Sequence, residues 1–147
     1  MKNAGNPVRV AVDAMGGDYA PGELVRGAIE AARHGHVHIA IVGDPDKIEL
    51  ELATHDTSGL PITTVPSEGV VLEGQAPAMA LRQKPKASIL VSTGMVKNGM
   101  ADSCVTMGST GGAMAAAAVV LGVIDGIDRP ALGGPIMGLA PRTVIID

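Results

Sequence analysis

Residues 8–18 read VRVAVDAMGGD, a short apolar run followed at once by an acidic, glycine-rich segment. The β-branched residues of Val8–Val12 predict a buried strand, and the Asp, Gly and Pro content of Asp13–Pro21 predicts a loop. A helix is predicted over Gly22–Arg33, because apolar residues recur there at helical spacing, and Gly35 is a plausible stop. A strand, a glycine loop and a helix in this order are typical of α/β proteins.

The same alternation continues along the chain. Further strands are predicted at His38–Val42, Ile62–Val65, Ser103–Met107 and Thr143–Ile146, with a short extended piece at Val70–Leu72. Helices are predicted at Lys47–Ala53 after an Asp44 cap and Pro45, at Ala76–Gln83, at Ser88–Lys97 with Ser88 as cap, and at Ala113–Val123. Asp125–Ala140 is interpreted as a connection. We therefore predict one three-layer αβα domain with a mostly parallel sheet and right-handed crossovers.

The last residues of the sequence lead to a separate expectation about the length of the protein. Asp147 follows directly on the apolar run Thr143–Ile146, which would leave an unpaired strand edge. We therefore expect residues 1–147 to be a truncated portion of a longer protein whose second lobe is absent, or to pair with strands of another chain.

The amino-acid composition bears on which classes of partner the protein binds and on its cellular location. The net charge is −4, there is no basic run, and Tyr19 is the single aromatic residue, so no nucleic acid partner is expected. Cys104 is the one cysteine, which fits a reducing cytoplasm, and no secretory signal is visible. Ser103–Ile124 is uncharged and long enough to span a bilayer, but its glycines and the polar pair Ser109-Thr110 favour strand, loop and helix.

The segment Gly108–Gly112, GSTGG, lies between a predicted strand and a predicted helix. Backbone amides at such a junction point outward and the helix dipole favours an anion, while the Ser109 and Thr110 hydroxyls add donors. The glycines, among them Gly111, let the backbone approach a ligand. The alternative is a tight turn with Thr110 as helix cap. The segment is not a P-loop, because no lysine follows its glycines.

A second glycine loop, with Asp13, Gly16 and Gly17, leaves the carboxyl end of the first strand. In an open parallel sheet ligands bind beyond the carboxyl ends of strands, so both loops are expected at one edge of the sheet. Asp13 is a candidate for binding a polar ligand or orienting a cation. The alternative is a loop cap that accepts from the Gly16 or Gly17 amide.

A third candidate is the cationic segment with Arg82, Lys84 and Lys86, which could hold phosphate or the acidic surface of a carrier. Its alternative is a solvated helix end. Three other features are not expected to form sites. The alternating His34, His36 and His38 complete no metal-ligand set, Cys104 is interpreted as a buried hydrophobe, and without a GxGxxG motif no cofactor is expected.

Several segments together resemble the PlsX-type phosphate acyltransferases of bacterial phospholipid synthesis. The resemblance rests on VAVDAMGGDYAP at 10–21, VGD at 42–44, ALRQK at 80–84, ADS at 101–103, GSTG at 108–111, LG at 121–122 and GIDRPA at 126–131. It runs in register over nearly all of the chain. This sequence departs from the family pattern at Ser109, where Asn is usual, and at Pro85 and Ala87 beside the cationic segment.

The resemblance implies a fold like that of the isopropylmalate dehydrogenases and acyl transfer from acyl-acyl-carrier-protein to inorganic phosphate. It also implies a homodimer and peripheral association with the inner membrane through the missing half, while the residues themselves indicate no cofactor and no metal. On this basis Ser109, Thr110, Arg82 and Lys84 are expected to be catalytic, and Asp13, Gly16, Gly17, Gly108 and Gly111 to bind substrate. The alternatives are a non-catalytic fragment that folds or dimerises, and a phosphate acetyltransferase or butyryltransferase that uses acyl-CoA. A dehydrogenase is disfavoured.

Overall fold

The computed structural model describes residues 7–72, 74–128, 130–134 and 144–146. Four parallel strands form its main sheet in the order β3-β2-β1-β4. They are β1 (Val8–Asp13), β2 (Val37–Gly43), β3 (Ile62–Pro66) and β4 (Ser103–Thr106). The chain therefore runs outward from β1 to β3 and then returns to place β4 on the other side of β1. Such a reversal of strand order is where open α/β sheets bind ligands.

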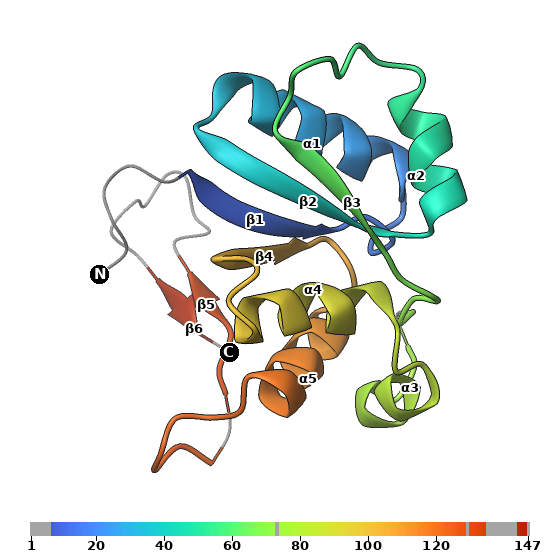
Figure 1. Ribbon diagram of the computed structural model, residues 1–147. Coiled ribbons are helices and arrows are strands. Elements are labelled where there is room, and N and C mark those ends of the chain that lie inside the picture. The colour runs from blue at the N-terminus through green and yellow to red at the C-terminus, as the bar shows by residue number, and fades with distance from the viewer. Residues whose placement is uncertain (1–6, 73, 129, 135–143, 147) are drawn as a thin grey trace.

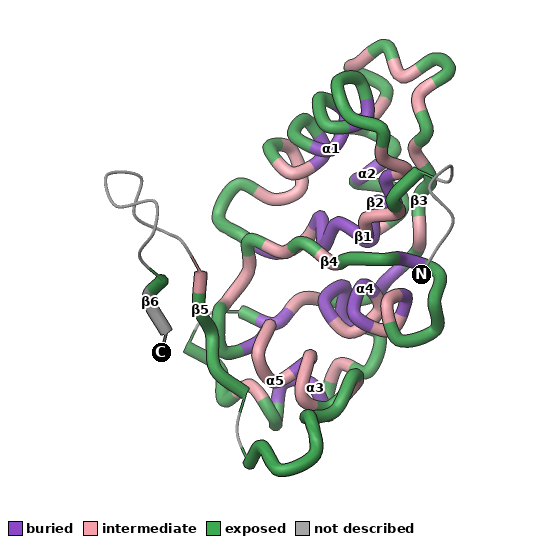
Figure 2. Tube along the Cα trace, turned by 90° about the vertical axis from the view of Figure 1, so that its left-hand side faces the viewer, coloured by how far each residue is buried: buried purple, intermediate pink, exposed green. Residues whose placement is uncertain are grey.

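Helices cover both faces of the sheet, which confirms the predicted α/β fold (Figure 1). On one face α1 (Gly22–His34) and α2 (Pro45–Leu52) enclose a core that includes Val12, Ile29 and Ile41. On the other face α4 (Ser88–Lys97) packs on Ala11, Ala40 and Val42. Alternate residues of one strand thus enter different cores, because successive side chains of a strand point to opposite faces. In Figure 2 the buried positions follow the strands and the helix sides that face them.

Two further helices complete the second face. α3 (Pro77–Gln83) and α5 (Thr110–Val120) pack together beyond α4, around a small apolar cluster that includes Val71, Leu81 and Ala116. A separate antiparallel pair joins β5 (Gly133–Gly134) to β6 (Ile145–Ile146). Part of the predicted connection 125–140 and the start of the predicted strand 143–146 lie outside the described residues.

Local signals explain the start of α2 and the end of α4. The Asp44 carboxylate accepts from the amides of Asp46 and Lys47, with Pro45 at the first helical position, so the predicted cap of α2 is confirmed. Asn98 ends α4, and Gly99 follows with a φ of 69°, which glycine adopts without strain.

The bounds predicted for α4 are confirmed, but two predicted N-caps and the predicted start of α5 were wrong. The N-cap of α4 is Ala87 rather than Ser88, whose hydroxyl is buried without a partner. α5 begins at Thr110, three residues before the predicted Ala113, and Ser109 is its N-cap in place of Thr110. The predicted extended piece at Val70–Leu72 forms no strand. The uncharged stretch 103–124 divides into β4 and α5, and no helix in the described part of the chain is long and apolar enough to cross a membrane.

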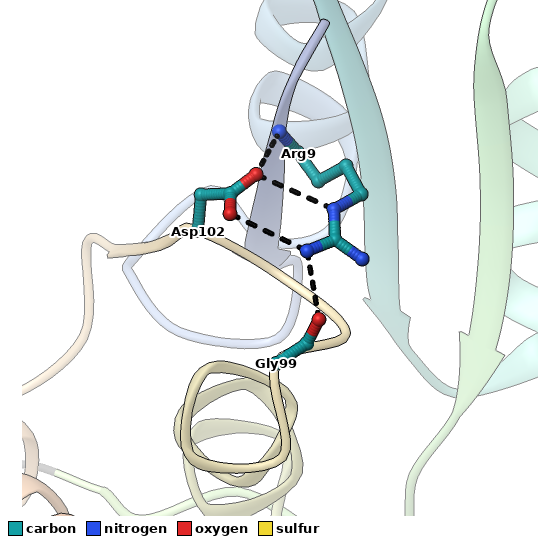
Figure 3. A network of polar contacts seen from close by, with 3 residues as sticks. All are labelled: Arg9, Gly99 and Asp102. Atoms are coloured by element: carbon teal, nitrogen blue, oxygen red, sulfur yellow. Dashed lines mark hydrogen bonds and ion pairs between the residues drawn. The ribbon is translucent and has the colours of Figure 1, made fainter. Parts of the chain in front are cut away.

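A polar network fixes the approach to β4 (Figure 3). The Arg9 guanidinium on β1 donates to both Asp102 carboxylate oxygens at 3.3 Å and to the Gly99 carbonyl at 2.7 Å. The Arg9 amide also donates to Asp102 at 2.9 Å, and the Asp102 amide donates back to the Arg9 carbonyl at 2.8 Å. These contacts hold the segment that enters β4 against β1 and so set where the loop after β4 emerges.

Candidate anion site at the strand switch

The two glycine loops meet at the carboxyl edge, between β1 and β4. A Cβ placed on Gly16 would lie 3.0 Å from the Gly108 amide nitrogen, and one placed on Gly17 would lie 3.1 Å from the Met107 carbonyl oxygen. One on Gly108 would lie 3.3 Å from the Gly16 Cα. The predicted shared edge is therefore present in the structure. Glycine is needed at these positions because the two backbones touch.

Asp13 fastens the two loops together. Its side chain is buried at 2 % exposure, and its Oδ2 accepts a 2.8 Å hydrogen bond from the Thr106 hydroxyl. The same hydroxyl accepts from the Gly108 amide at 3.1 Å, while Asp13 Oδ1 accepts from the Met15 amide at 3.2 Å. Asp13 and Thr106 are register partners in the parallel pair of β1 and β4. Both carboxylate oxygens are thus engaged within the protein.

Thr106 is a residue that the sequence interpretation did not single out. It stands in a strand of alternating burial, and nothing local distinguishes it from a sheet-forming threonine. Its significance comes from Asp13, 93 positions earlier in the chain. Knowledge of the strand order would have supplied the signal, because β1 and β4 then place these two positions side by side.

The amides of the turn divide into those already bonded and those left open. Gly108 donates to Thr106, and Gly112 donates to the Ser109 Oγ at 3.0 Å. The first amides of a helix have no acceptor within the helix, which leaves Thr110 and Gly111 pointing outward at the start of α5. Both residues are exposed. The donors of the segment that remain available are therefore at residues 109–111, whereas the Gly108 amide is already bonded.

The Asp13 charge favours the same placement. A buried carboxylate repels an anion strongly when little water separates them, and Asp13 lies against the Gly16–Gly108 contact. A cavity of about 10 Å³ separates Asp13 and Thr106 from Ser109, with Val70 and Val71 in its wall. This space accommodates one water molecule and no phosphate. The exposed amides of Thr110 and Gly111 lie outside this cavity.

The two predicted cations are not brought together. Arg82 is exposed and lines a separate hollow of about 470 Å³ on α3, with Met79 and Gln83. The Lys84 ammonium donates to the Val70 carbonyl at 2.7 Å, so it lies beside the wall of the cavity that Ser109 lines. Lys86 pairs with Glu68 at 3.0 Å. Lys84 thus contributes positive charge near the rim, whereas Arg82 belongs to another surface.

Cys104 is half-buried on β4 and packs against the cluster around Val71. Burial raises the pKa of its thiol, and the nearby Asp13 charge raises that pKa further, against a smaller lowering by a hydrogen bond with Thr93. A thiol with a pKa above the ordinary value of about 8.5 is protonated at neutral pH. This environment is that of an inert cysteine rather than a nucleophile.

We expect iodoacetamide to alkylate Cys104 more slowly in the folded chain than in the urea-unfolded chain, with the rate rising at a higher pH. Only the thiolate reacts, and the folded state disfavours it. By the same linkage, this thiol makes the folded state lose stability as the pH rises through the alkaline range, where the unfolded chain ionises first. Mass spectrometry of quenched samples measures the rate. Equal rates in both states at pH 8 would contradict the prediction.

Comparison with known proteins gives two consistent findings. Residues 8–147 match the model of a family described as fatty acid synthesis protein. Similar curated proteins carry the name phosphate acyltransferase. One from Acaryochloris marina is 48% identical over 126 residues, which are 86% of this chain and 36% of that protein. One from Heliobacterium modesticaldum is 47% identical over 143 residues, which are 95% of this chain and 42% of that protein. The chain thus spans about two fifths of the length of these relatives.

Proposed function

This chain belongs to the fatty acid synthesis protein family, and we propose that it is the N-terminal part of an acyltransferase that forms acyl phosphate in fatty acid and phospholipid synthesis. The proposed donor is an acyl group on acyl carrier protein, and the acceptor is inorganic phosphate. The observation that carries the proposal is the junction at the strand switch, where the first turn of α5 presents Ser109 and two open amides.

The reaction needs little covalent help from the protein. A phosphate oxygen attacks the thioester carbonyl, the C–O bond forms, and the C–S bond breaks to release the carrier thiolate, which takes up a proton. Phosphate is itself the nucleophile, so no activated serine or cysteine is required, in keeping with the protonated Cys104. The tasks left for the protein are to hold two reactants together and to stabilise the oxyanion.

The hydrogen bonds of each residue indicate the role that we propose for it. The Ser109 Oγ accepts from Gly112, which leaves its proton free to donate outward beside the Thr110 and Gly111 amides. Lys84 adds charge at the rim, and Asp13, Gly16, Gly17 and Gly108 fix the shape of the turn rather than contact phosphate. Arg82 lines the separate hollow on α3, so a role in catalysis would require its side chain to reach the substrate from there.

The test is release of carrier thiol from acyl-acyl-carrier-protein in the presence of phosphate, with the 147-residue chain and the whole Acaryochloris marina protein assayed side by side. We expect Ser109→Ala, and its counterpart in the relative, to lower kcat/KM for phosphate about 10-fold or more, because a donor to the developing charge is lost. Ser58→Ala, an exposed serine at the opposite end of the sheet, is the matched control. An unchanged kcat/KM for phosphate in Ser109→Ala would refute the assigned site.

Two other results would redirect the proposal. Activity in the relative but not in this chain would favour the reading of a non-catalytic piece, which the coverage of about two fifths supports. A strong preference for acyl-CoA over acyl-acyl-carrier-protein would indicate a phosphate acetyltransferase or butyryltransferase. Size-exclusion chromatography with light scattering tests the proposed homodimer, and sedimentation with vesicles tests peripheral membrane association.

A further inference from the structure

A second hollow, of about 440 Å³, lies on the same carboxyl edge, over β1, β2 and β3. Its walls come from the segments that follow these strands, with Met15 after β1, Asp44, Pro45 and Lys47 after β2, and Ser67 and Val70 after β3. Val70 also lines the small cavity beside Ser109, so the hollow lies next to the cavity that borders the turn at residues 109–111. The volume is within the range of about 300–1,000 Å³ that small-molecule sites occupy.

The wall formed by residues 67–70 is held in place before any ligand arrives. The Ser67 amide donates to the Gly43 carbonyl and the Glu68 amide to the Lys86 carbonyl, both at 2.8 Å. The Ser88 amide donates to the Gly69 carbonyl at 3.3 Å, and Lys84 holds the Val70 carbonyl at 2.7 Å. A site with a preformed wall loses little entropy on binding.

The charges around the hollow are already paired. Lys47 lies 3.9 Å from the Asp44 carboxylate, and Glu68 lies 3.0 Å from Lys86. The three charged residues that line the hollow, Asp44, Lys47 and Glu68, are therefore all in ion pairs, and the nearby Lys84 ammonium is bound to the Val70 carbonyl. Met15, Pro45 and Val70 supply apolar wall. This lining suits a neutral chain with methylene segments.

The Ser67 side chain indicates that a ligand in the hollow carries a hydrogen-bonding group. It is 7 % exposed, and its hydroxyl oxygen is buried without a hydrogen-bond partner. Buried polar groups in folded proteins are nearly always paired, so an unpaired hydroxyl at the wall of a hollow points to a partner carried by a ligand. A neutral ligand with amide or hydroxyl groups would provide it.

Resting on the proposed acyl transfer, we propose that this hollow binds the pantetheine arm of the acyl donor. Pantetheine is an uncharged chain of methylene and methyl groups, two amides and two hydroxyls that ends in the thiol, and in the acyl donor its terminal hydroxyl is esterified to phosphate. Lying over Pro45 and Ser67, it would bring the thioester past Val70 to the turn at residues 109–111. Acyl carrier protein and coenzyme A both carry this arm, so the hollow recognises what they share.

The test is titration of the ¹⁵N-labelled chain with D-pantetheine, followed by amide chemical shifts. We expect saturable shifts at residues 44, 46 and 47 and at residues 67–70. Pro45→Trp, at an exposed wall position, should weaken binding at least 10-fold by filling the hollow, and Ser67→Ala should weaken it at least 3-fold. Ser58→Ala should bind as the parent does. Absent shifts, shifts confined to α3, or equal affinity in Pro45→Trp would each overturn the proposal, provided that its spectrum remains that of a folded chain.

A phosphate titration of the same samples separates this inference from the proposed function. Phosphate is expected to shift residues 109–111 in the parent and in both hollow variants. A phosphate response without a pantetheine response overturns the hollow alone, whereas the reverse overturns the anion site. Coenzyme A and holo-acyl-carrier-protein, with the apo-carrier as control, then show which donor gains affinity from the groups beyond the arm.

Discussion

Gly16→Ala is expected to lower the free energy of unfolding by about 1–3 kcal/mol, the usual cost of overpacking, and to abolish the phosphate response at residues 109–111. Gly16 is buried, and an added Cβ would lie 2.8 Å from Asp13 Oδ2, 2.9 Å from Thr106 Oγ1 and 3.0 Å from the Gly108 nitrogen. These three atoms are linked by hydrogen bonds through the Thr106 hydroxyl, so one cannot move away without disturbing the others. The methyl group must therefore push the two loops apart. Urea denaturation and phosphate titration measure the two effects.

Gly27→Ala is the matched control for this substitution. Gly27 lies inside α1, and an added Cβ there meets no atom within 4 Å. Alanine in a helix interior is more favourable than glycine by about 0.5–1 kcal/mol, so this variant should be more stable than the parent. Neither glycine has a positive φ, which means that the contrast isolates contact from backbone strain. A Gly16→Ala chain as stable as the parent would show that the loops are not in contact.

Much of the fold could be predicted because the deciding signals are local. The apolar run Val8–Val12 and the helical spacing after Gly22 predicted β1 and α1 to within one residue at each end. The Asp44-Pro45 pair predicted the start of α2. The common edge of the two glycine loops followed from one rule about parallel strands. Each of these inferences uses residues that are adjacent in the sequence or a rule that holds for the whole class.

The sequence did not predict the start of α5 because Gly111 and Gly112 were interpreted as part of a loop. In the structure they belong to the helix and allow close packing. Gly111 and Gly112 have no positive φ and lie in the first helical turn. A Cβ on Gly111 would lie 3.1 Å from Pro77, and one on Gly112 would lie 3.2 Å from Val71. Small residues there let α5 approach Val71 and the first residue of α3. A glycine run between a strand and a helix does not reveal this, because the contacting residues are more than 30 positions away.

The polar contacts of the site were hidden for the same reason. The sequence shows that Lys84 is a cation, but not that its ammonium reaches the Val70 carbonyl 14 positions earlier. It shows Ser67 only as the residue after a weak strand, and its buried, unpaired hydroxyl emerges only from the packing. Side-chain hydrogen bonds between distant segments depend on strand order and register. Both must be known before such bonds can be inferred.

Asp13→Ala is expected to lower the free energy of unfolding by about 3 kcal/mol, because hydrogen bonds to a buried charged group contribute about 1.5–3 kcal/mol each and two partly buried donors would be left unpaired. The Thr106 hydroxyl and the Met15 amide would both lose their acceptor. Asp13→Asn should cost less, about 1 kcal/mol, since it keeps the shape and one acceptor oxygen. Urea denaturation monitored by circular dichroism measures each value.

A double-mutant cycle that combines Asp13→Ala with Thr106→Val tests whether the hydrogen bond between Asp13 and Thr106 connects the two loops. Thr106 Oγ1 lies 2.8 Å from Asp13 and 3.1 Å from the Gly108 amide, so removing either partner disturbs the same chain of hydrogen bonds. The losses should therefore be non-additive by about 1–2 kcal/mol, as for residues in direct contact. Thr106→Ser, which keeps the hydroxyl, should restore most of the phosphate response that Thr106→Val loses. Additive losses, or a Thr106→Val chain that binds phosphate like the parent, would mean that Asp13 supports β1 alone and that the turn at residues 109–111 is positioned by other contacts.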